Sequence, residues 1–488
     1  MSKPEVESLE HCNDTESLSE EHKQYLLERH GTINLDPVPC MSDADPLNWP
    51  KWKKIANLCL VAFHGMMATF TAAAIQSAFI EIAEDLEVSV QRASYLTSLV
   101  IAILGGAPLF WRPLSHTYGR RPTFLVSLLC SLVGNIGCAV SPTYGTMGLC
   151  RAITAFFICP AASIGTAVVS ETFFRNERAR YMGVWTTMVT LGVPVAPLIF
   201  GFVAMRTGYR WIYWILAMTN GAQFILHGLF GPETRFEPGI QSQANSSFRQ
   251  QYLSFRRIDP KPLKLKDFIH PLGFIRFPNV VVPTVAHAMV FLWGSVMTTF
   301  EIPQVFPEKF GFNTQQVGLQ NIGIIIGTIA GEQIGGILSD KWMGLRERKG
   351  KRPEPEYRLW LSYMGYLTAI CGVVVFLVQL DRASDTWDVT PIVGAGIAAA
   401  GNQIVTTIMI TYAVDCYPRD AAAVGVFITF IRQCWGFIGP FWIPQMVESP
   451  GLSLSAVIST ATIVAAAVLP TTLLQFKGRH WRTQGTRN

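Results

Sequence analysis

Charge is scarce in this sequence. Only 15% of its 488 residues are Asp, Glu, Lys or Arg, whereas 50% are hydrophobic and the mean hydropathy is +0.29. A soluble protein of this length needs a larger polar surface than that composition supplies. The shortage of charge therefore excludes a pair of soluble domains and predicts a membrane protein.

The sequence also lacks the short motifs of hydrolytic and redox enzymes. Gly344–Arg352 contains Gly and Lys, but its glycines are one position too far apart for a phosphate-binding loop and no Ser or Thr follows Lys351. There is no His-Glu-x-x-His zinc motif, and the 10 cysteines show no metal-binding or redox spacing. We therefore expect free thiols, no metal, no cofactor and no enzymatic activity.

Neither a compact basic domain nor a signal peptide is present. The net charge of +5 is spread over many loops, so no nucleic-acid partner is expected. Residues 1–50 hold no apolar signal-peptide core, and we expect the first span to act as an uncleaved signal. This region is rich in Glu, Ser and His, buries too little apolar surface to offset chain entropy, and is predicted to be a disordered tail.

Twelve apolar runs of helix length are present. Lipid offers no hydrogen-bond partners to a peptide group, so a span must be a helix of about 20 residues or a strand of about 10 residues in a closed barrel. The runs cover about residues 55–78, 94–111, 122–140, 145–168, 182–204, 210–230, 280–302, 315–338, 358–380, 389–412, 421–445 and 453–475. These lengths predict an all-α membrane protein with twelve transmembrane helices.

Internal similarity divides the spans into six and six. The segment Arg112–Arg121, between the second and third spans, is echoed about 224 positions later by Gly335–Lys341, between the eighth and ninth spans. Matching segments also begin at Glu171 and Asp415. We therefore expect two pseudo-symmetric six-helix bundles. The predicted divisions are a tail at 1–50, a bundle at 51–230, a linker at 231–279, a bundle at 280–476 and a tail at 477–488.

The basic residues set the expected orientation. Of the 39 Lys and Arg residues, two lie inside spans and only a few lie on the side opposite the termini. Because positive segments near spans resist translocation, both termini and the linker are predicted to be cytosolic. Within the linker, Phe248–Phe277 mixes Arg and Lys with Phe, Leu and Ile, and either lies along the membrane surface or forms a solvated tether.

The loop after the second span contains Gly119-Arg120-Arg121-Pro122. Guanidinium groups there can pair with carboxylates and with the orphan C-terminal carbonyls of neighbouring helices, and so lock one face of a transporter. The alternative is that these charges only set the topology.

At this loop the chain resembles the major facilitator superfamily, whose signature there is a Gly, a small or apolar pair, an Asp and then Gly-Arg-Arg. Arg112 replaces the leading Gly and His116 replaces the Asp, whereas the second-half copy keeps Gly335 and Asp340. The gating residues that the resemblance implies are Gly119, Arg120, Arg121 and Asp340.

Charged residues within the predicted spans are functional candidates. Arg151 matches the single Arg of the family's second motif, and because a lone guanidinium in hydrocarbon costs about 3 kcal/mol it is expected to face a cavity or a partner. Glu332 and Glu301 are the predicted proton carriers, since a carboxylate inside a span is a functional-site hypothesis by default. Arg432 needs a counter-ion, for which either glutamate is a candidate.

Small residues form two patterns. Gly192, Pro197 and Gly201 in the fifth span resemble the family's third motif, which is associated with antiporters; the alternative is a packing kink that encodes no direction. In the eighth span a glycine recurs at every fourth position, which predicts close helix packing. This stripe consists of Gly323, Gly327, Gly331 and Gly335.

Polar and aromatic side chains within spans could line an amphipathic substrate pocket, although a face of aromatic residues is also typical of a helix core. The candidates are Gln76, Trp293, Phe300, Gln403 and Tyr412.

The resemblance covers about residues 45–476 and is most specific in Asp45–Lys54, in the loop described above and in Phe437–Phe441. These segments look like fungal twelve-span drug:proton antiporters, and Gly331–Gln333 and Arg432 also resemble members that handle polyamines and other organic cations. The resemblance implies a monomeric plasma-membrane transporter that exports a drug or secondary metabolite by proton antiport and alternating access. A proton-coupled importer of a polyamine or similar cation, and a polytopic membrane enzyme or sensor, are the alternatives.

Overall fold

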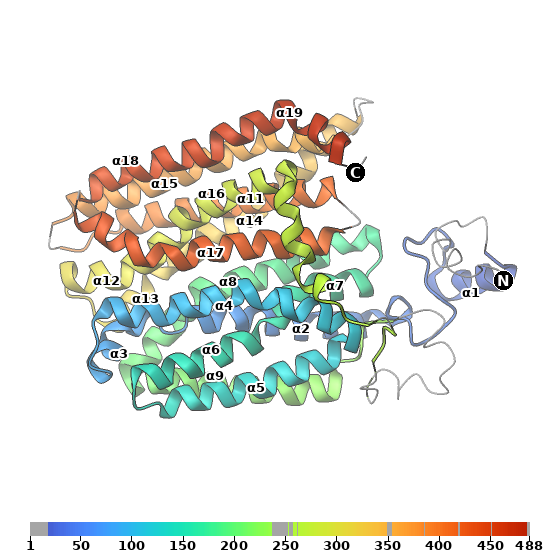
Figure 1. Ribbon diagram of the computed structural model, residues 1–488, viewed down its shortest axis with the longest axis horizontal. Helices are drawn as coiled ribbons and strands as arrows, with labels where there is room; N and C mark the ends of the chain where they lie inside the picture. Colours follow the sequence, from blue (N-terminus) through green and yellow to red (C-terminus); the bar gives the residue numbers. More distant parts are fainter. Residues whose placement is uncertain are drawn as a thin grey trace.

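The computed structural model describes residues 18–236, 252, 257–260, 262–348, 354–384, 386–417, 420–449 and 451–485. Every regular element within these residues is helical. The long helices run side by side along one axis, and both described ends of the chain lie at the same end of this bundle (Figure 1). That end is called the terminal face, and the other end is called the opposite face.

The first half of the chain forms six long helical units. Several units are interrupted by a short turn and continue in the same direction. The helices are α2 (Lys51–Ala73), α3 (Phe79–Asp85), α4 (Val90–Tyr118), α5 (Arg120–Val140), α6 (Tyr144–Ile158), α7 (Pro160–Thr172), α8 (Arg175–Thr207) and α9 (Arg210–Phe230), with a 3₁₀ turn at Gln76–Ala78.

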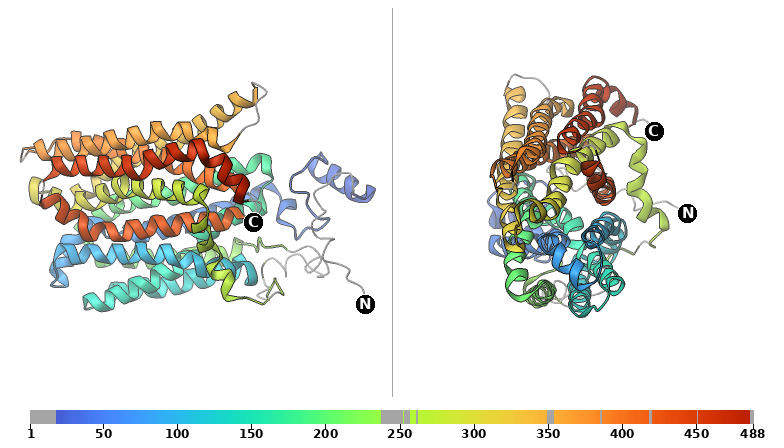
Figure 2. Two further views of the ribbon diagram at one scale, coloured as in Figure 1. Left: turned by 45° about the horizontal axis from the view of Figure 1, so that its top comes forward. Right: turned by 90° about the vertical axis from the view of Figure 1, so that its left-hand side faces the viewer.

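The second half repeats this arrangement. Its helices are α11 (Pro278–Phe291), α12 (Thr298–Phe310), α13 (Thr314–Leu319), α14 (Asn321–Arg348), α15 (Ser362–Arg382), α16 (Thr390–Cys416), α17 (Ala421–Glu448), α18 (Leu452–Ile463) and α19 (Leu469–Gly485). Short 3₁₀ or π-helical turns occupy Pro355–Leu361, Leu292–Met297 and Val464–Val468. Viewed along the helix axes, the two halves lie on either side of a seam (Figure 2).

Local sequence explains where the helices begin and end. Ser89 caps α4 by accepting a hydrogen bond from the backbone N–H of Arg92 at 3.2 Å, and Thr143 opens α6 with a capping box. A single residue, Gly119, separates α4 from α5 and has φ +100°, which residues with a side chain rarely adopt. Glycine at this position therefore makes the tight reversal possible.

Among the described residues, 11 helical segments are long and apolar enough to cross a bilayer. The predicted sixth span, α9, is not among them, because its apolar sequence is interrupted by Asn220, Gln223 and His227. All three side chains are buried within the first half, and Asn220 donates a hydrogen bond to Ser131 of α5 at 3.1 Å. The predicted all-α membrane class is confirmed.

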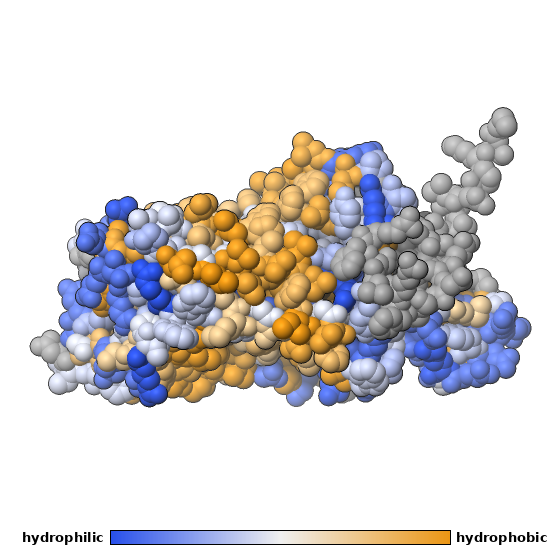
Figure 3. Space-filling model, turned by 90° about the horizontal axis from the view of Figure 1, so that it is seen from below, coloured by the Kyte–Doolittle hydropathy of each residue, from blue (hydrophilic) through white to orange (hydrophobic). Residues whose placement is uncertain are grey.

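The outer surface has the polarity that a bilayer requires. A hydrophobic band crosses the face shown in Figure 3 and lies between more hydrophilic ends. Large apolar side chains on the lipid-facing helices are exposed, for example Val133 and Leu149, which are 60% and 63% exposed. Lipid tails rather than other helices cover such side chains.

The glycine stripe of α14 packs against α16, as its spacing predicts. A Cβ added at Gly327 would overlap the carbonyl oxygen of Gly396, and one added at Gly331 would overlap that of Ala400. The two helix backbones therefore approach each other more closely than larger residues permit.

The N-terminal region differs from its prediction as a disordered tail. Residues 1–17 lie outside the described part of the chain, but residues 18–50 contain α1 (Glu20–His30) and a 3₁₀ turn at Pro46–Asn48. Ser19 caps α1, Gly31 ends it, and Asp36 forms a 3.0 Å ion pair with Arg175 at the start of α8. Local capping and contact with the bundle supply the order that composition alone does not suggest. At the other end, α19 continues to Gly485, into the predicted tail at 477–488.

Candidate functional site

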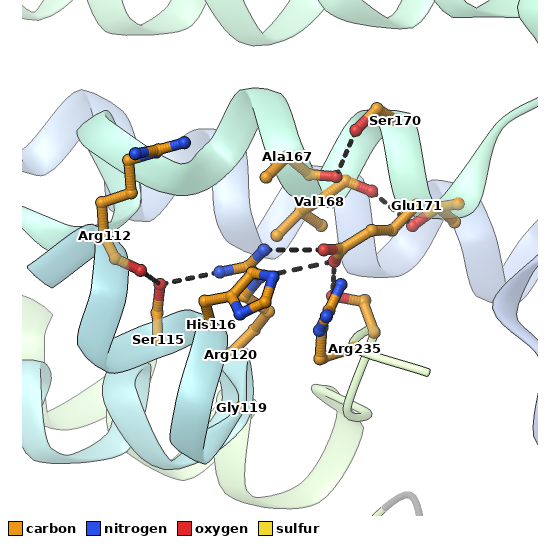
Figure 4. A network of polar contacts seen from close by, with 12 residues as sticks. Arg112, Ser115, His116, Gly119, Arg120, Ala167, Val168, Ser170, Glu171 and Arg235 are labelled. Carbon is orange, nitrogen blue, oxygen red and sulfur yellow. Dashed lines mark hydrogen bonds and ion pairs between the residues drawn. The ribbon is translucent and has the colours of Figure 1, made fainter. Parts of the chain in front are cut away.

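A charged cluster lies at the terminal face of the first half, where α5 begins. Arg120 donates to Glu171 of α7 at 2.7 Å and to the hydroxyl of Ser115 at 2.7 Å (Figure 4). The Arg120 and Glu171 side chains are only 6% and 17% exposed, and Thr234 donates a further hydrogen bond to Glu171. This buried, charge-assisted pair joins the ends of α4, α5 and α7.

Arg121 binds the C-terminal end of α9. Its guanidinium donates to the backbone carbonyls of His227 and Gly228 at 2.8 Å each and also to that of Gly231. These carbonyls lie at the C-terminal end of α9, where the N–H of Gly231 also donates to the carbonyl of His227 and the negative end of the helix dipole favours a cation. The two kinds of partner proposed for this loop, a carboxylate and helix-end carbonyls, are both present.

The side chain of Glu233 binds the backbone at the start of α5. Its carboxylate accepts from the backbone N–H groups of Arg120 at 2.9 Å and Arg121 at 3.0 Å, so it caps the first turn of α5. Burial raises the pKa of Glu233 above its ordinary value, while these backbone donors act in the opposite direction. A Cβ at Gly119 would overlap this carboxylate.

The second half contains a matching cluster. Arg358 forms a 3.1 Å ion pair with Asp415 of α16 and donates to the hydroxyl of Ser339 at 2.7 Å. The side chain of Asp340, which the sequence comparison predicts as the gating acid of this half, lies outside the described residues. Arg358 was not predicted, because the connection between α14 and α15 is longer than that between α4 and α5. The repeat matches Ser115 with Ser339 and Glu171 with Asp415. Because Arg120 binds the first serine and acid, these matches could have indicated an arginine that binds the second pair.

Two residues of this loop depart from the family signature, Arg112 and His116, and the second has a partner in the linker. His116 lies 3.6 Å from Asp259 of the linker, and Arg112 is partly buried in α4. Among the described residues, the hydrogen bonds of Arg120 go to the first half and to the segment that follows α9. The Arg120 cluster therefore stiffens one bundle and does not itself cross the seam.

The seam is fastened at the opposite face. Within the described parts of the two halves, the hydrogen bonds between them run from Thr314 to Glu81 at 2.7 Å and from Gln91 to the carbonyl of Pro440 at 2.7 Å. Tyr95 also stacks on Phe441, with ring centroids 4.4 Å apart. These contacts join α3 and α4 of the first half to α13 and α17 of the second half.

Glu332 lies at the seam between α14 and α8. Its carboxylate accepts a hydrogen bond from Gln403 of α16, so these two predicted residues are brought together. Glu332 also lines a narrow gap between the two halves that is too small to hold a water molecule. The gap is lined by Thr187, Thr190, Leu191, Thr328, Ile329 and Glu332. Three threonines and Glu332 thus lie next to one another where the two halves meet, and the threonines were not predicted.

The two predicted cavity arginines have different surroundings. Arg151 is 1% exposed; its Nε donates to the carbonyl of Leu96 at 3.1 Å and its Nη1 to the Tyr213 hydroxyl at 3.4 Å, within the first half. Arg432 lies over the ring of Phe291 at 5.0 Å, and its Nε is buried without a hydrogen-bond partner among the described residues. The expected ion pair of Arg432 with Glu332 or Glu301 is absent from the described ion pairs.

The remaining candidates fall into separate places. Gln76 and Phe300 are buried where the 3₁₀ turn after α2 meets α12, and Phe79 lies 6.2 Å from Phe300. Trp293 packs edge-on against Trp442, and Glu301 is 2% exposed. Tyr412 lies away from this group, because its hydroxyl is against Gly478 of α19 within the second half.

The antiporter-like motif lies along close backbone contacts of α8. A Cβ at Gly201 would lie 2.9 Å from the carbonyl oxygen of Thr314, and one at Gly318 would lie 2.6 Å from that of Pro197. Gly192 faces α2, where a Cβ would lie 2.7 Å from the carbonyl oxygen of Met66. The motif therefore brings α8 close to both its own bundle and the other half.

Two six-helix halves with a polar seam inside a hydrophobic band define a polytopic membrane transporter. Residues 60–440 match the Major Facilitator Superfamily, and the chain belongs to this family. The predicted fold and family are thereby confirmed. The protein is a transporter and not an enzyme.

Its relatives are fungal membrane proteins. The chain is 27% identical over 436 residues to the MFS-type transporter atr4 of Stereocaulon alpinum, covering 86% of this chain and 77% of the relative. It is 25% identical over 452 residues to the efflux pump radE of Floropilus chiversii, with 89% and 82% covered. It is 24% identical over 458 residues to the uncharacterized transporter mfc1 of Schizosaccharomyces pombe, with 88% and 91% covered.

Proposed function

We propose that this protein is a secondary transporter that exports an amphipathic or cationic small organic molecule in exchange for protons. Family membership and the relatives named as efflux pumps support the transport class and the direction. We further propose that the terminal face is cytosolic, because the basic residues gather there. The plasma membrane is the membrane that the family resemblance implies.

The observation that carries the proposal is the position of Glu332. Its carboxylate lies within a spanning helix, beside Gln403 and opposite the threonines of α8 at the seam. A carboxylate at such a depth can hold either a proton or a cationic group of a substrate, but not both at once. Competition between the two for one carboxylate is the simplest form of antiport.

Alternating access supplies the second part of the mechanism. The seam contacts Thr314–Glu81 and Gln91–Pro440 hold the opposite face together. Rocking of the two halves that breaks these contacts would expose the Glu332 gap to the other side of the membrane. The Arg120 and Arg358 clusters keep each half rigid during this movement.

Flux in proteoliposomes with an imposed pH gradient tests the proposal. Organic cations should accumulate against their gradient in the direction opposite to proton flow, and Glu332→Gln should reduce this flux at least about 10-fold. Glu332→Asp, which keeps the carboxyl group, is the matched control and should retain part of the flux. Undiminished proton-driven flux in Glu332→Gln would contradict the assignment, and movement of substrate with protons would indicate import.

A further inference from the structure

A short helical segment of the linker runs crosswise to all the spanning helices. It consists of α10 (Leu265–Ile269) and the 3₁₀ helix His270–Arg276 that follows. It crosses from the first half toward the second at the edge of the bundle, near the terminal face (Figures 1 and 2). Because the spanning helices follow the membrane normal, this segment, which we call the crosswise segment, lies parallel to the membrane plane.

The crosswise segment lies at the depth of the spanning helices rather than beyond them. Phe268 contacts Phe110 of α4, with ring centroids 5.9 Å apart. Phe110 lies two turns before the end of α4 at Tyr118, which is about 12 Å along the helix. Phe110 is itself 39% exposed on the outer surface of the bundle. The linker therefore returns from the end of α4, where Ile258 donates to Thr117, toward the bilayer.

The other end of the crosswise segment is held by the second half. Phe274 is 5% exposed and belongs to a buried cluster that includes Phe427 of α17. Its ring also packs against Tyr417 at 5.9 Å. The segment is therefore fixed to α4 at one end and to the α16 and α17 region at the other.

Around these two attachments the segment exposes large apolar side chains. Leu265, Ile269 and Ile275 are 79%, 53% and 65% exposed. Exposed basic side chains flank them at Lys264, Lys266 and Arg276, whereas Asp267 is the only acid in residues 262–277. None of these three cations is in an ion pair with the described residues. Apolar and basic side chains together, on a helix in the membrane plane, are typical of an interfacial anchor.

We propose that the crosswise segment is an in-plane anchor that binds anionic phospholipid headgroups of the leaflet at the terminal face. Leu265, Ile269 and Ile275 enter the boundary between headgroups and acyl chains. Lys264, Lys266 and Arg276 contact the lipid phosphates and carboxylates. The bilayer is the occupant because Phe110, beside the segment, already lies on the lipid-facing surface. A lipid bound to this segment lies next to both halves of the protein.

The test uses the full chain in nanodiscs. An environment-sensitive fluorescent amino acid is placed at position 269, and in a matched sample at position 41, where Met41 is 47% exposed in the N-terminal region. Position 269 should be quenched by lipids that carry a doxyl group near the headgroup and protected from iodide, whereas position 41 should show the reverse. Iodide quenching as strong at 269 as at 41 would overturn the proposal. Protection of 269 from both quenchers would also overturn it, because another protein copy would then cover the segment.

The choice of lipid is tested with charge variants. Lys264→Gln/Lys266→Gln/Arg276→Gln should reduce retention of phosphatidylserine in mixed nanodiscs about 5-fold or more, without changing retention of phosphatidylcholine. The control Lys51→Gln/Arg180→Gln/Lys341→Gln removes three exposed cations elsewhere and should have a small effect. Equal losses in the two triple variants would reject a specific site.

Discussion

Arg358 pairs with Asp415 at 3.1 Å in the same relation that Arg120 has to Glu171 in the first half. In each half the arginine also donates to a serine near the end of the preceding long helix, Ser115 or Ser339. The two clusters differ in exposure, because Glu171 is 17% exposed and Asp415 is 39% exposed. This difference decides how much each pair contributes.

Removing Arg120 should be costly. Arg120→Ala leaves Glu171 without its cation in a mostly buried site, and the expected loss is about 3 kcal/mol in the free energy of unfolding. Thermal unfolding of the purified protein in detergent measures this, and Glu171→Gln in the same background tests the cause. If the double variant is no more stable than Arg120→Ala, the buried charge is not the reason.

Removing Arg358 should cost less. Asp415 remains accessible to water, so Arg358→Ala should lower the free energy of unfolding by about 1 kcal/mol or less. The loss should also diminish at high salt, since exposed pairs are screened. Thermal unfolding of both arginine variants under the same conditions compares them. An equal or larger loss for Arg358→Ala would contradict the ranking.

The turn at Gly119 should not tolerate a side chain. Gly119→Ala combines a left-handed backbone with overlap of Glu233, and should destabilise the protein by about 1–3 kcal/mol. Gly106→Ala, in the preceding helix α4, is the control because a Cβ there meets nothing within 4 Å. Similar melting temperatures for the two variants would show that the loop relaxes around the new methyl group.

The close contact of α14 with α16 gives a second matched pair. Gly327→Ala places a methyl group on the carbonyl of Gly396, whereas Gly336→Ala, on the same helix, faces open space. We expect Gly327→Ala to lower the melting temperature and the flux, because the helices must separate, and Gly336→Ala to leave both nearly unchanged. A stable and active Gly327→Ala protein would mean that α14 shifts without cost.

The seam contact at the opposite face should open during transport. Thr314→Cys/Glu81→Cys treated with a short bifunctional thiol reagent should lose flux, and cleavage of the linkage by a reductant should restore it. The single-cysteine variants treated in the same way control for the native thiols. Full flux in the cross-linked protein would show that this side of the seam does not open.

The sequence predicts much of the fold and less of the site. Span positions follow from apolar length, and the contacts of Arg120 and Arg121 follow from charge placed beside helix ends. Arg358 was missed because loop length shifts the register of the repeat. The gap at Glu332 could not be predicted, because the threonines of α8 are distant in sequence and ordinary in composition.

The position of Tyr412 shows the same limit. Its place in α16 suggests a cavity, yet the rotation of the helix turns it toward α19. Helix rotation depends on packing against neighbours, here the glycine contacts between α14 and α16, and not on the polarity of one side chain. The contacts of residues 18–50 likewise depend on a surface that exists only after the bundle has formed.

The buried polar residues of α9 bear on how the protein is made. Asn220, Gln223 and His227 lie on a helix that, among the described spans, falls short of the apolar character of its neighbours. A helix of this kind partitions poorly into lipid when it leaves the translocation channel alone. The hydrogen bond from Asn220 to Ser131 forms only when α9 packs against α5, and it stabilises α9 within the membrane. We therefore expect the helices of the first bundle to integrate as a group rather than one span at a time.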